Sequence, residues 1–266
     1  MTFDQSPAGL ATLYADIGRQ LAAHTRKADA LAAVAQTAVA RVPGAEWASI
    51  TAGRPGSFET VASTHPGALL ADKIQYELGA GPCVDAILQQ TVFRTGDLSG
   101  DARWPDFGQL AVDAVGVYSM LSFRLFLEDD DLIAGLNMYA QARDAFDETA
   151  QTVGTLLATQ GALAISAAAA RERAAQLLQA LASNRDIGVA MGVLMSQHKI
   201  TRSQAFDLLR VASQNTNRKL ADIAVEVGDT GSLGLPGQAD ADRRLAGRPG
   251  ALPHSRSADD EAADWE

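Results

Sequence analysis

Hydrophobic residues recur every three or four positions in several stretches of the chain, which is the spacing of a helix that buries one face. In the first of these stretches the apolar positions are Leu10, Leu13, Ile17 and Leu21. The segments with this spacing in the first 120 residues are 8–23, 27–41, 67–90 and 106–115. A Gly79-Ala80-Gly81-Pro82 run interrupts the third segment, because glycine and proline both disfavour a continuous helix.

Short runs rich in β-branched and aromatic residues lie between these helices and predict strands. They are residues 47–51, 58–61, 92–94, 117–128 and 132–141. A Gly53-Arg54-Pro55-Gly56 turn joins the first two, and Asp129-Asp130-Asp131 forms a tight turn between the last two. Strands that are interrupted by helices and end in an antiparallel hairpin indicate an α+β domain with one central antiparallel sheet, over residues 8–145.

A long apolar seam follows, in steps that alternate between three and four residues. Its members are Val153, Leu156, Gln160, Leu163, Ala167, Ala170, Ala174, Leu177 and Leu181. A seam kept for about four heptads is typical of a coiled coil, so residues 146–181 are predicted to form a linker helix that pairs two copies of the chain. A single amphipathic helix that lies on its own domain is the alternative. The alanines in the middle of the seam bury little area, so they contribute little to pairing.

Residues 182–231 are predicted to form a bundle of three short helices. The first carries Ile187, Ala190, Met191 and Leu194 at helical spacing. The second begins at Thr201, with Gln204 three residues later as in a capping box. The third is expected to end at Gly228. Residues 232–266 show no periodicity and many small or charged residues, which predicts a disordered tail.

Charge and composition narrow the class of protein. The net charge of −10 makes the chain as a whole a poor non-specific partner for nucleic acid. Residues 177–231 carry 6 basic and 5 acidic residues, so they are the segment best suited to a polyanion. The single cysteine excludes an internal disulfide, and no signal peptide precedes the first helix, so a cytoplasmic protein is expected. The uncharged run Thr149–Ala170 holds too many threonine, glutamine and alanine residues to favour a membrane span.

Motifs for catalysis are missing from the sequence. It has no Gly-Lys pair for a phosphate-binding loop, no HExxH and no Gly-x-Ser-x-Gly elbow. The four histidines share no ligand spacing. We therefore expect no enzyme activity, no catalytic residue, no metal and no cofactor.

Several segments of the first domain resemble the GAF family. They are Gly81-Pro82-Cys83-Val84-Asp85-Ala86, Asp97-Leu98, Asp101-Ala102-Arg103-Trp104-Pro105, Gly116-Val117-Tyr118-Ser119 and Gly135-Leu136-Asn137-Met138-Tyr139. The resemblance covers about residues 10–160. It implies a six-stranded antiparallel sheet flanked by helices that senses a small molecule or a redox signal, and it leaves the ligand unknown.

The C-terminal bundle is similar to the ANTAR family. The matching segments are Ser183–Met195, Gln204–Arg210, Ala212-Ser213 and Asn217–Ala224. The resemblance implies a three-helix RNA-binding module that acts in transcription antitermination. Such modules dimerise through the preceding helix and hold paired stem-loops in a nascent mRNA leader, which prevents the terminator hairpin. Met191 stands where the family often has a lysine, and its spacing suits the core.

Eight residues of this bundle are candidates for RNA contact, because they match family positions or lie in the first turn between helices. They are Arg185, Gly192, Lys199, Arg202, Arg210, Asn217, Arg218 and Lys219. Arginine and lysine would bind phosphate or stack on loop bases, although each could equally be a solvated surface residue. Gly192 would let RNA or a partner helix approach closely. Asn217 is expected to cap the third helix, with contact to a base edge as the alternative.

Four other residues have two possible roles each. Phe206 could stack on a base, but its spacing predicts a core position. Cys83 could be a redox sensor, but a small buried residue is the preferred interpretation. Arg103 and Trp104 either line a ligand pocket or pack a loop.

A second function remains open for the bundle. Three short helices are also typical of a helix-turn-helix module that binds DNA or a protein. Its second helix offers few polar side chains for reading bases, namely Arg202, Gln204, Asp207 and Arg210.

Overall fold

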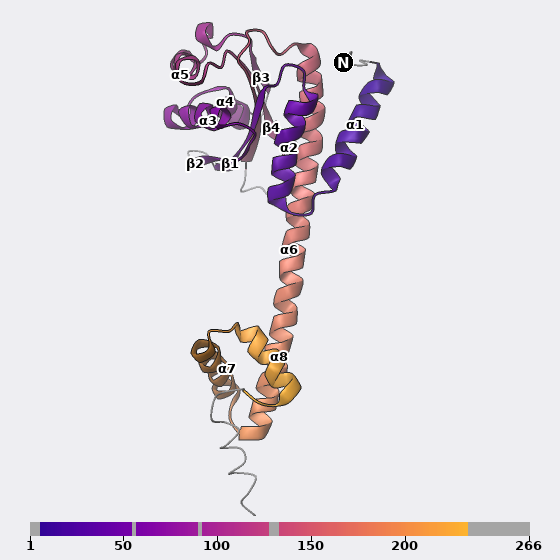
Figure 1. The fold of residues 1–266 in the computed structure, drawn as a ribbon, viewed down its shortest axis with the longest axis vertical. Coiled ribbons are helices and arrows are strands. Elements are labelled where there is room, and N and C mark those ends of the chain that lie inside the picture. Colours follow the sequence, from indigo (N-terminus) through magenta and orange to yellow (C-terminus); the bar gives the residue numbers. More distant parts are fainter. Residues whose placement is uncertain (1–5, 55–56, 90–91, 128–132, 234–266) are drawn as a thin grey trace, which may run out of the picture. The chain divides into compact units, whose positions relative to one another are not determined.

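The computed structural model describes residues 6–54, 57–89, 92–127 and 133–233 (Figure 1). The chain divides into two compact units, Met1–Gln176 and Leu177–Glu266. Three predictions lie wholly or partly outside the described residues: the turn at 53–56, of which Pro55 and Gly56 are not described, the tight turn at Asp129–Asp131, and nearly all of the tail at 232–266.

The first unit is built on an antiparallel sheet. Its strands are β1 (Trp47–Arg54), β2 (Ser57–Ser63), β3 (Val92–Thr95), β4 (Ser119–Leu125) and β5 (Ile133–Ala140). Their order across the sheet is β2-β1-β5-β4-β3, and all neighbours are antiparallel. The α+β class with one central antiparallel sheet is therefore confirmed. The resemblance implied six strands, whereas the sheet has five among the described residues.

Helices cover both faces of this sheet (Figure 1). On one face lie α1 (Pro7–Ala22), α2 (Lys27–Arg41) and the first half of α6 (Glu148–His198). On the other face lie α3 (Pro66–Leu78), α4 (Pro82–Gln89), α5 (Pro105–Val115) and the short 3₁₀ helix η1 (Leu98–Gly100). The predicted interruption of the third helical segment is confirmed, because Gly79 ends α3 in the left-handed conformation at φ 64°.

The first half of α6 belongs to the core of this unit. Val153, Leu157 and Ile165 are at most 1% exposed and pack with α1, α2 and the sheet. By length and composition α6 could also cross a membrane, but 44% of its most apolar window is buried inside the protein. Burial of this kind is what a core helix needs, so the apolar character of the segment has an explanation within the fold.

The part of α6 from Leu177 onward, together with α7 (Arg202–Thr216) and α8 (Leu220–Thr230), forms the second unit. Their core residues are Ala190, Met191, Leu194, Ala205, Leu209, Ala212, Ile223, Ala224, Val227 and Leu233. The capping box at Thr201 and Gln204 is confirmed, with reciprocal hydrogen bonds at the start of α7. Met191 is 8% exposed and packs in this core, as its spacing predicts.

Two helix ends differ from the prediction. The first short helix of the bundle is no separate element, because α6 continues unbroken from Glu148 to His198. The third helix does not end at Gly228 but continues to Thr230. Gly231 ends it, because this residue adopts the left-handed conformation at φ 73° that glycine tolerates best.

Candidate functional site

A buried polar cluster surrounds Asp72 in the first unit, between α3 and the sheet. Asp72 is fully buried, and its carboxylate accepts hydrogen bonds from the hydroxyl of Tyr139 and, at 3.1 Å, from the amide of Asn137. The hydroxyl of Thr60 donates to the other carboxylate oxygen at 2.8 Å. The cluster therefore joins α3 to β2 and β5 through polar contacts inside an otherwise apolar core.

The carboxylate of Asp72 has only neutral hydrogen-bond partners among the described residues. Burial raises the pKa of Asp72 from 3.8 to about 6, and the hydrogen bonds from Tyr139, Ser49, Thr60 and Asn137 oppose that rise. The same burial, together with the negative charge of Asp72, raises the pKa of Tyr139 well above its usual value. Asp72, with its pKa of about 6, is therefore the member of this cluster whose pKa lies nearest to neutral pH.

Cys83 borders the same cluster. It is fully buried, and its thiol donates to the hydroxyl of Thr51 at 3.3 Å. Burial and the charge of Asp72 raise the pKa of Cys83 to about 12. A buried thiol with so high a pKa stays protonated, and the thiolate is the reactive form, so Cys83 is the small buried residue that was expected.

Sequence reasoning missed this cluster, although a signal was present. Asp72 and Gln75 lie on the same face of α3 as Ala68 and Ala71, and all four are fully buried. A carboxylate on the apolar face of a helix indicates a buried polar site. Asn137 completes that site from β5, and its carbonyl oxygen is buried without a hydrogen-bond partner among the described residues.

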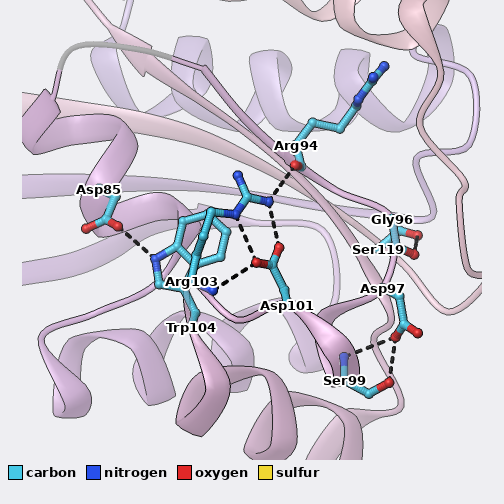
Figure 2. Close-up of polar contacts among 9 residues, drawn as sticks. All are labelled: Asp85, Arg94, Gly96, Asp97, Ser99, Asp101, Arg103, Trp104 and Ser119. Atoms are coloured by element: carbon cyan, nitrogen blue, oxygen red, sulfur yellow. Dashed lines mark hydrogen bonds and ion pairs between the residues drawn. The ribbon is translucent and has the colours of Figure 1, made fainter.

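Arg103 and Trp104 pack a loop, which decides between their two predicted roles (Figure 2). Arg103 donates to both carboxylate oxygens of Asp101, at 2.9 and 2.6 Å, and to the carbonyl of Arg94 at 3.0 Å. Its guanidinium lies 4.4 Å from the ring centroid of Trp104. The indole of Trp104 donates to Asp85 at 2.7 Å. These contacts fasten the segment before α5 to β3 and α4, and the Arg103 hydrogen bonds lower the pKa of Asp101 to about 2.

A separate apolar groove lies on the α6 side of the sheet. Its volume is about 450 Å³, and its walls come from β3, β4 and α6. The lining residues are Val92, Phe123, Arg124, Phe126, Thr155, Ala158, Thr159, Ala162 and Leu163. Among the described residues, no cluster of three or more His, Cys, Asp or Glu side chains could hold a metal ion.

In the second unit, three of the candidate arginines form exposed ion pairs. Arg185 lies 3.3 Å from Asp186, Arg210 lies 3.2 Å from Asp207, and Arg218 lies 2.6 Å from Glu226. Exposed ion pairs stabilise a fold by only about 0–1 kcal/mol. A phosphate group can therefore replace the carboxylate partner at small cost.

The other three cationic candidates have no ion pair with another described residue. Lys199 lies between α6 and α7 with φ 56°, Arg202 opens α7, and Lys219 is the N-cap residue of α8. All three side chains are exposed. The three residues lie at the loop between α6 and α7 and at the loop between α7 and α8. Because they are exposed, a polyanion can reach them.

Gly192 and Asn217 lie at the surface of the unit. A Cβ atom at Gly192 would meet no atom within 4 Å, so the fold leaves this side of α6 open. The expectation that Asn217 caps the third helix is wrong. Asn217 is instead the C-cap of α7, in the left-handed conformation at φ 53°, which asparagine tolerates better than most residues.

Phe206 also departs from its predicted place. Its side chain is 42% exposed, whereas Ala205 and Leu209 beside it on α7 are fully buried. The core of the second unit takes Ala205, Leu209 and Ala212 from α7 and does not include the ring of Phe206.

Two family models match the chain. The GAF domain model matches residues 24–166, and the ANTAR domain model matches residues 175–227. No curated protein matches the chain.

Solved structures resemble about two thirds of the chain at low identity. The GAF domain of a phosphoenolpyruvate-protein phosphotransferase (ptsP) from Coxiella burnetii is 16% identical, with a TM-score of 0.49 over 63% of this chain and 99% of that chain. A free methionine-R-sulfoxide reductase from Neisseria meningitidis is 18% identical, with a TM-score of 0.46 over 66% of this chain and 98% of that chain. The phycoerythrobilin-bound GAF domain of a cyanobacterial phytochrome is 18% identical, with a TM-score of 0.46 over 61% of this chain and 97% of that chain.

Proposed function

The chain belongs to the GAF domain family and carries a C-terminal ANTAR domain, and on this premise we propose that it is an RNA-binding regulator of transcription antitermination. In this proposal the ANTAR domain binds paired stem-loops in nascent mRNA leaders and thereby prevents the terminator hairpin. The GAF domain controls that binding in response to a small molecule of unknown identity. The protein is cytoplasmic and has no catalytic role of its own.

The observation that carries the proposal is the match of residues 175–227 to the ANTAR model, in a unit whose exposed cations are available. Lys199, Arg202 and Lys219 have no ion pair with another described residue, and the pairs of Arg185, Arg210 and Arg218 are exposed. Contacts from such side chains to phosphate supply most of the affinity for RNA and make it depend on salt.

Homodimerisation through residues 146–181 is part of the proposal. Leu177, Leu178 and Leu181 of α6 are between 56% and 67% exposed, and no described residue covers them. Large apolar side chains on one stretch of helix favour pairing with a second helix, because pairing removes their surface from water. Since Val153 is buried in the core of its own unit, the pairing contacts lie toward the C-terminal part of this range.

A gel-shift experiment tests the proposal. The full chain is mixed with a pool of RNAs that carry two adjacent hairpins with randomised loops, and the bound RNAs are selected. We expect selected hairpins to bind at least tenfold more tightly than scrambled RNA of equal length, and the affinity to fall steeply as salt rises. Equal affinity for scrambled RNA contradicts the proposal. Preferred binding to duplex DNA would favour the helix-turn-helix alternative instead.

A further inference from the structure

A groove crosses the second unit between α6 and α7. Its volume is about 720 Å³, and its lining residues are Asn184, Ile187, Gly188, Met191, Arg202, Ser203 and Phe206. Grooves of this size hold small flat ligands in many proteins. Of the candidate RNA-binding residues, only Arg202 lines this groove. The other lining residues are therefore a possible binding surface that the search for basic residues did not identify.

The wall on the α7 side presents an aromatic ring. Phe206 is 42% exposed, and it follows Arg202 by one turn of α7, so both side chains face the groove. The core of the unit is complete without this ring, because Ala205 and Leu209 fill the buried side of α7. An aromatic ring that the core does not use is available for stacking.

The wall on the α6 side contains a glycine, Gly188. Asn184, Ile187, Gly188 and Met191 form one face of the helix at steps of three, one and three residues. Glycine disfavours a helix interior. Nothing in the packing requires it here, because a Cβ atom at Gly188 would meet no atom within 4 Å. Its effect is to leave the α6 side of the groove without a side chain at this one position.

The polar groups that line the groove are neutral or positive. Arg202 has no ion pair with another described residue, Ser203 offers a hydroxyl, and Asn184 offers an amide that both donates and accepts. No acidic residue lines the groove. A planar heterocycle attached to a phosphate fits such a groove. The heterocycle can stack on Phe206 and bond to the amide of Asn184, and the phosphate can pair with Arg202.

We infer that this groove takes one unpaired nucleobase from the loop of a bound RNA hairpin. The base stacks on Phe206 and occupies the space that the missing side chain of Gly188 leaves. The inference rests on the proposed RNA-binding function and deepens it by assigning the loop base a site. Stacking on an aromatic ring is the usual way in which proteins hold unpaired bases. Arg202 then binds the phosphate next to that base, and Asn184 contacts its edge.

The test uses the full chain and a hairpin selected from the randomised pool, with 2-aminopurine placed at each loop position in turn. Stacking quenches the fluorescence of this base analogue. We expect strong quenching at one loop position on binding, its loss in Phe206→Leu, and its retention in Phe206→Trp. Phe206→Leu also weakens binding roughly 10- to 100-fold, because stacking of one base contributes that much. Val211→Ala is the matched control, since Val211 is 41% exposed on α7 outside the groove.

A second variant separates a role in binding from a role in folding. Gly188→Leu fills the groove but improves helix propensity, so it is expected to raise the melting temperature of the second unit and to weaken binding at least tenfold. An abasic nucleotide at the quenched position is expected to weaken binding to the wild type and to have little further effect on Phe206→Leu.

The outcomes distinguish a failure of the proposed function from a failure of the base site alone. If the wild type binds selected and scrambled RNA equally, both the proposed function and this inference are overturned. If selected hairpins bind but quenching and affinity do not change in Phe206→Leu and Gly188→Leu, only the base site is overturned. Reduced affinity without quenching at any loop position in the wild type would also overturn it, and would assign the groove to another partner.

Discussion

The carboxylate of Asp72 on α3 accepts a hydrogen bond from the amide of Asn137 on β5 at 3.1 Å, in a place that water does not reach. Sixty-five residues separate the two along the chain. The contact ties the helical layer to the central strand of the sheet. It also places an ionisable group where the fold prefers the neutral form.

Replacing Asp72 by asparagine is expected to stabilise the first unit at neutral pH. The pKa of Asp72 in the folded state is about 6, against 3.8 as the ordinary value. The charged form therefore destabilises the fold, by about 3 kcal/mol above pH 6. An asparagine keeps an oxygen that accepts from Tyr139 and Asn137, and its amide can donate to Thr60. Urea unfolding at pH 7 measures the difference, with Asp113→Asn on the exposed side of α5 as the control.

The same shift sets the pH dependence of the wild type. A raised pKa means that the folded state binds the proton more tightly than the unfolded state does. The destabilising effect of Asp72 is absent below about pH 4, grows up to about pH 6 and is constant above it. The difference in unfolding free energy between Asp72→Asn and the wild type should follow this curve. A difference that is independent of pH from 4 to 8 would show that Asp72 is ionised at little cost.

Cys83 is expected to resist thiol reagents in the folded protein. Its thiol is fully buried and its pKa is about 12, so almost no thiolate exists at pH 8 and the reagent cannot reach it. Reaction with iodoacetamide, followed by mass spectrometry, should modify less than a few per cent of the native chain and all of the chain in 8 M urea. Rapid modification without denaturant would restore the redox-sensor role.

Replacing Leu177 and Leu181 together by glutamate is expected to weaken dimerisation at least tenfold. The two side chains are 62% and 56% exposed and lie one turn apart on α6, so both contact a partner helix in the proposed dimer. Burying a leucine contributes about 1.5–3 kcal/mol. Sedimentation equilibrium measures the effect. Gln179→Glu, on the same exposed stretch, adds a charge without removing a leucine and should leave the dimer intact.

Releasing an arginine from its carboxylate partner is expected to strengthen RNA binding. Arg218 lies 2.6 Å from Glu226, so Glu226→Gln frees the guanidinium and removes a negative charge near the phosphates. Arg218→Gln should weaken binding and reduce the slope of affinity against salt by about one unit. Gel shifts between 50 and 200 mM salt measure both. Unchanged slopes in both variants would remove Arg218 from the RNA surface.

Much of the fold could be predicted because local patterns decide it. Glycine and proline mark the ends of α3 and α5, and the capping box at Thr201 marks the start of α7. The features that the hydrophobic pattern did not predict depend on tertiary packing. Val153 fits a coiled-coil seam and a core helix equally well by spacing, and only the position of α1 and α2 shows that the core covers it.

The candidate functional residues of both units were harder to predict, because their surroundings also depend on tertiary packing. The spacing of Phe206 suits a core position, but the core takes Ala205, Leu209 and Ala212 from α7, and Phe206 lies on the exposed side of that helix. The Asp72 cluster draws residues from α3, β2 and β5, which are far apart in the sequence. The cationic candidates were found from family positions or from their place in the first turn between helices. The ion pairs that three of them form depend on rotamers that spacing does not reveal.

Crosslinking in the native cell tests the central claim most directly. RNAs bound to the full chain are fixed by ultraviolet light, recovered with the protein and sequenced, beside a control strain that carries Arg202→Gln and Lys219→Gln. We predict that the recovered RNAs are mRNA leaders in which two adjacent stem-loops overlap a terminator, and that the control recovers at least tenfold fewer of them. Recovery of no leader above the level of the control would contradict the account.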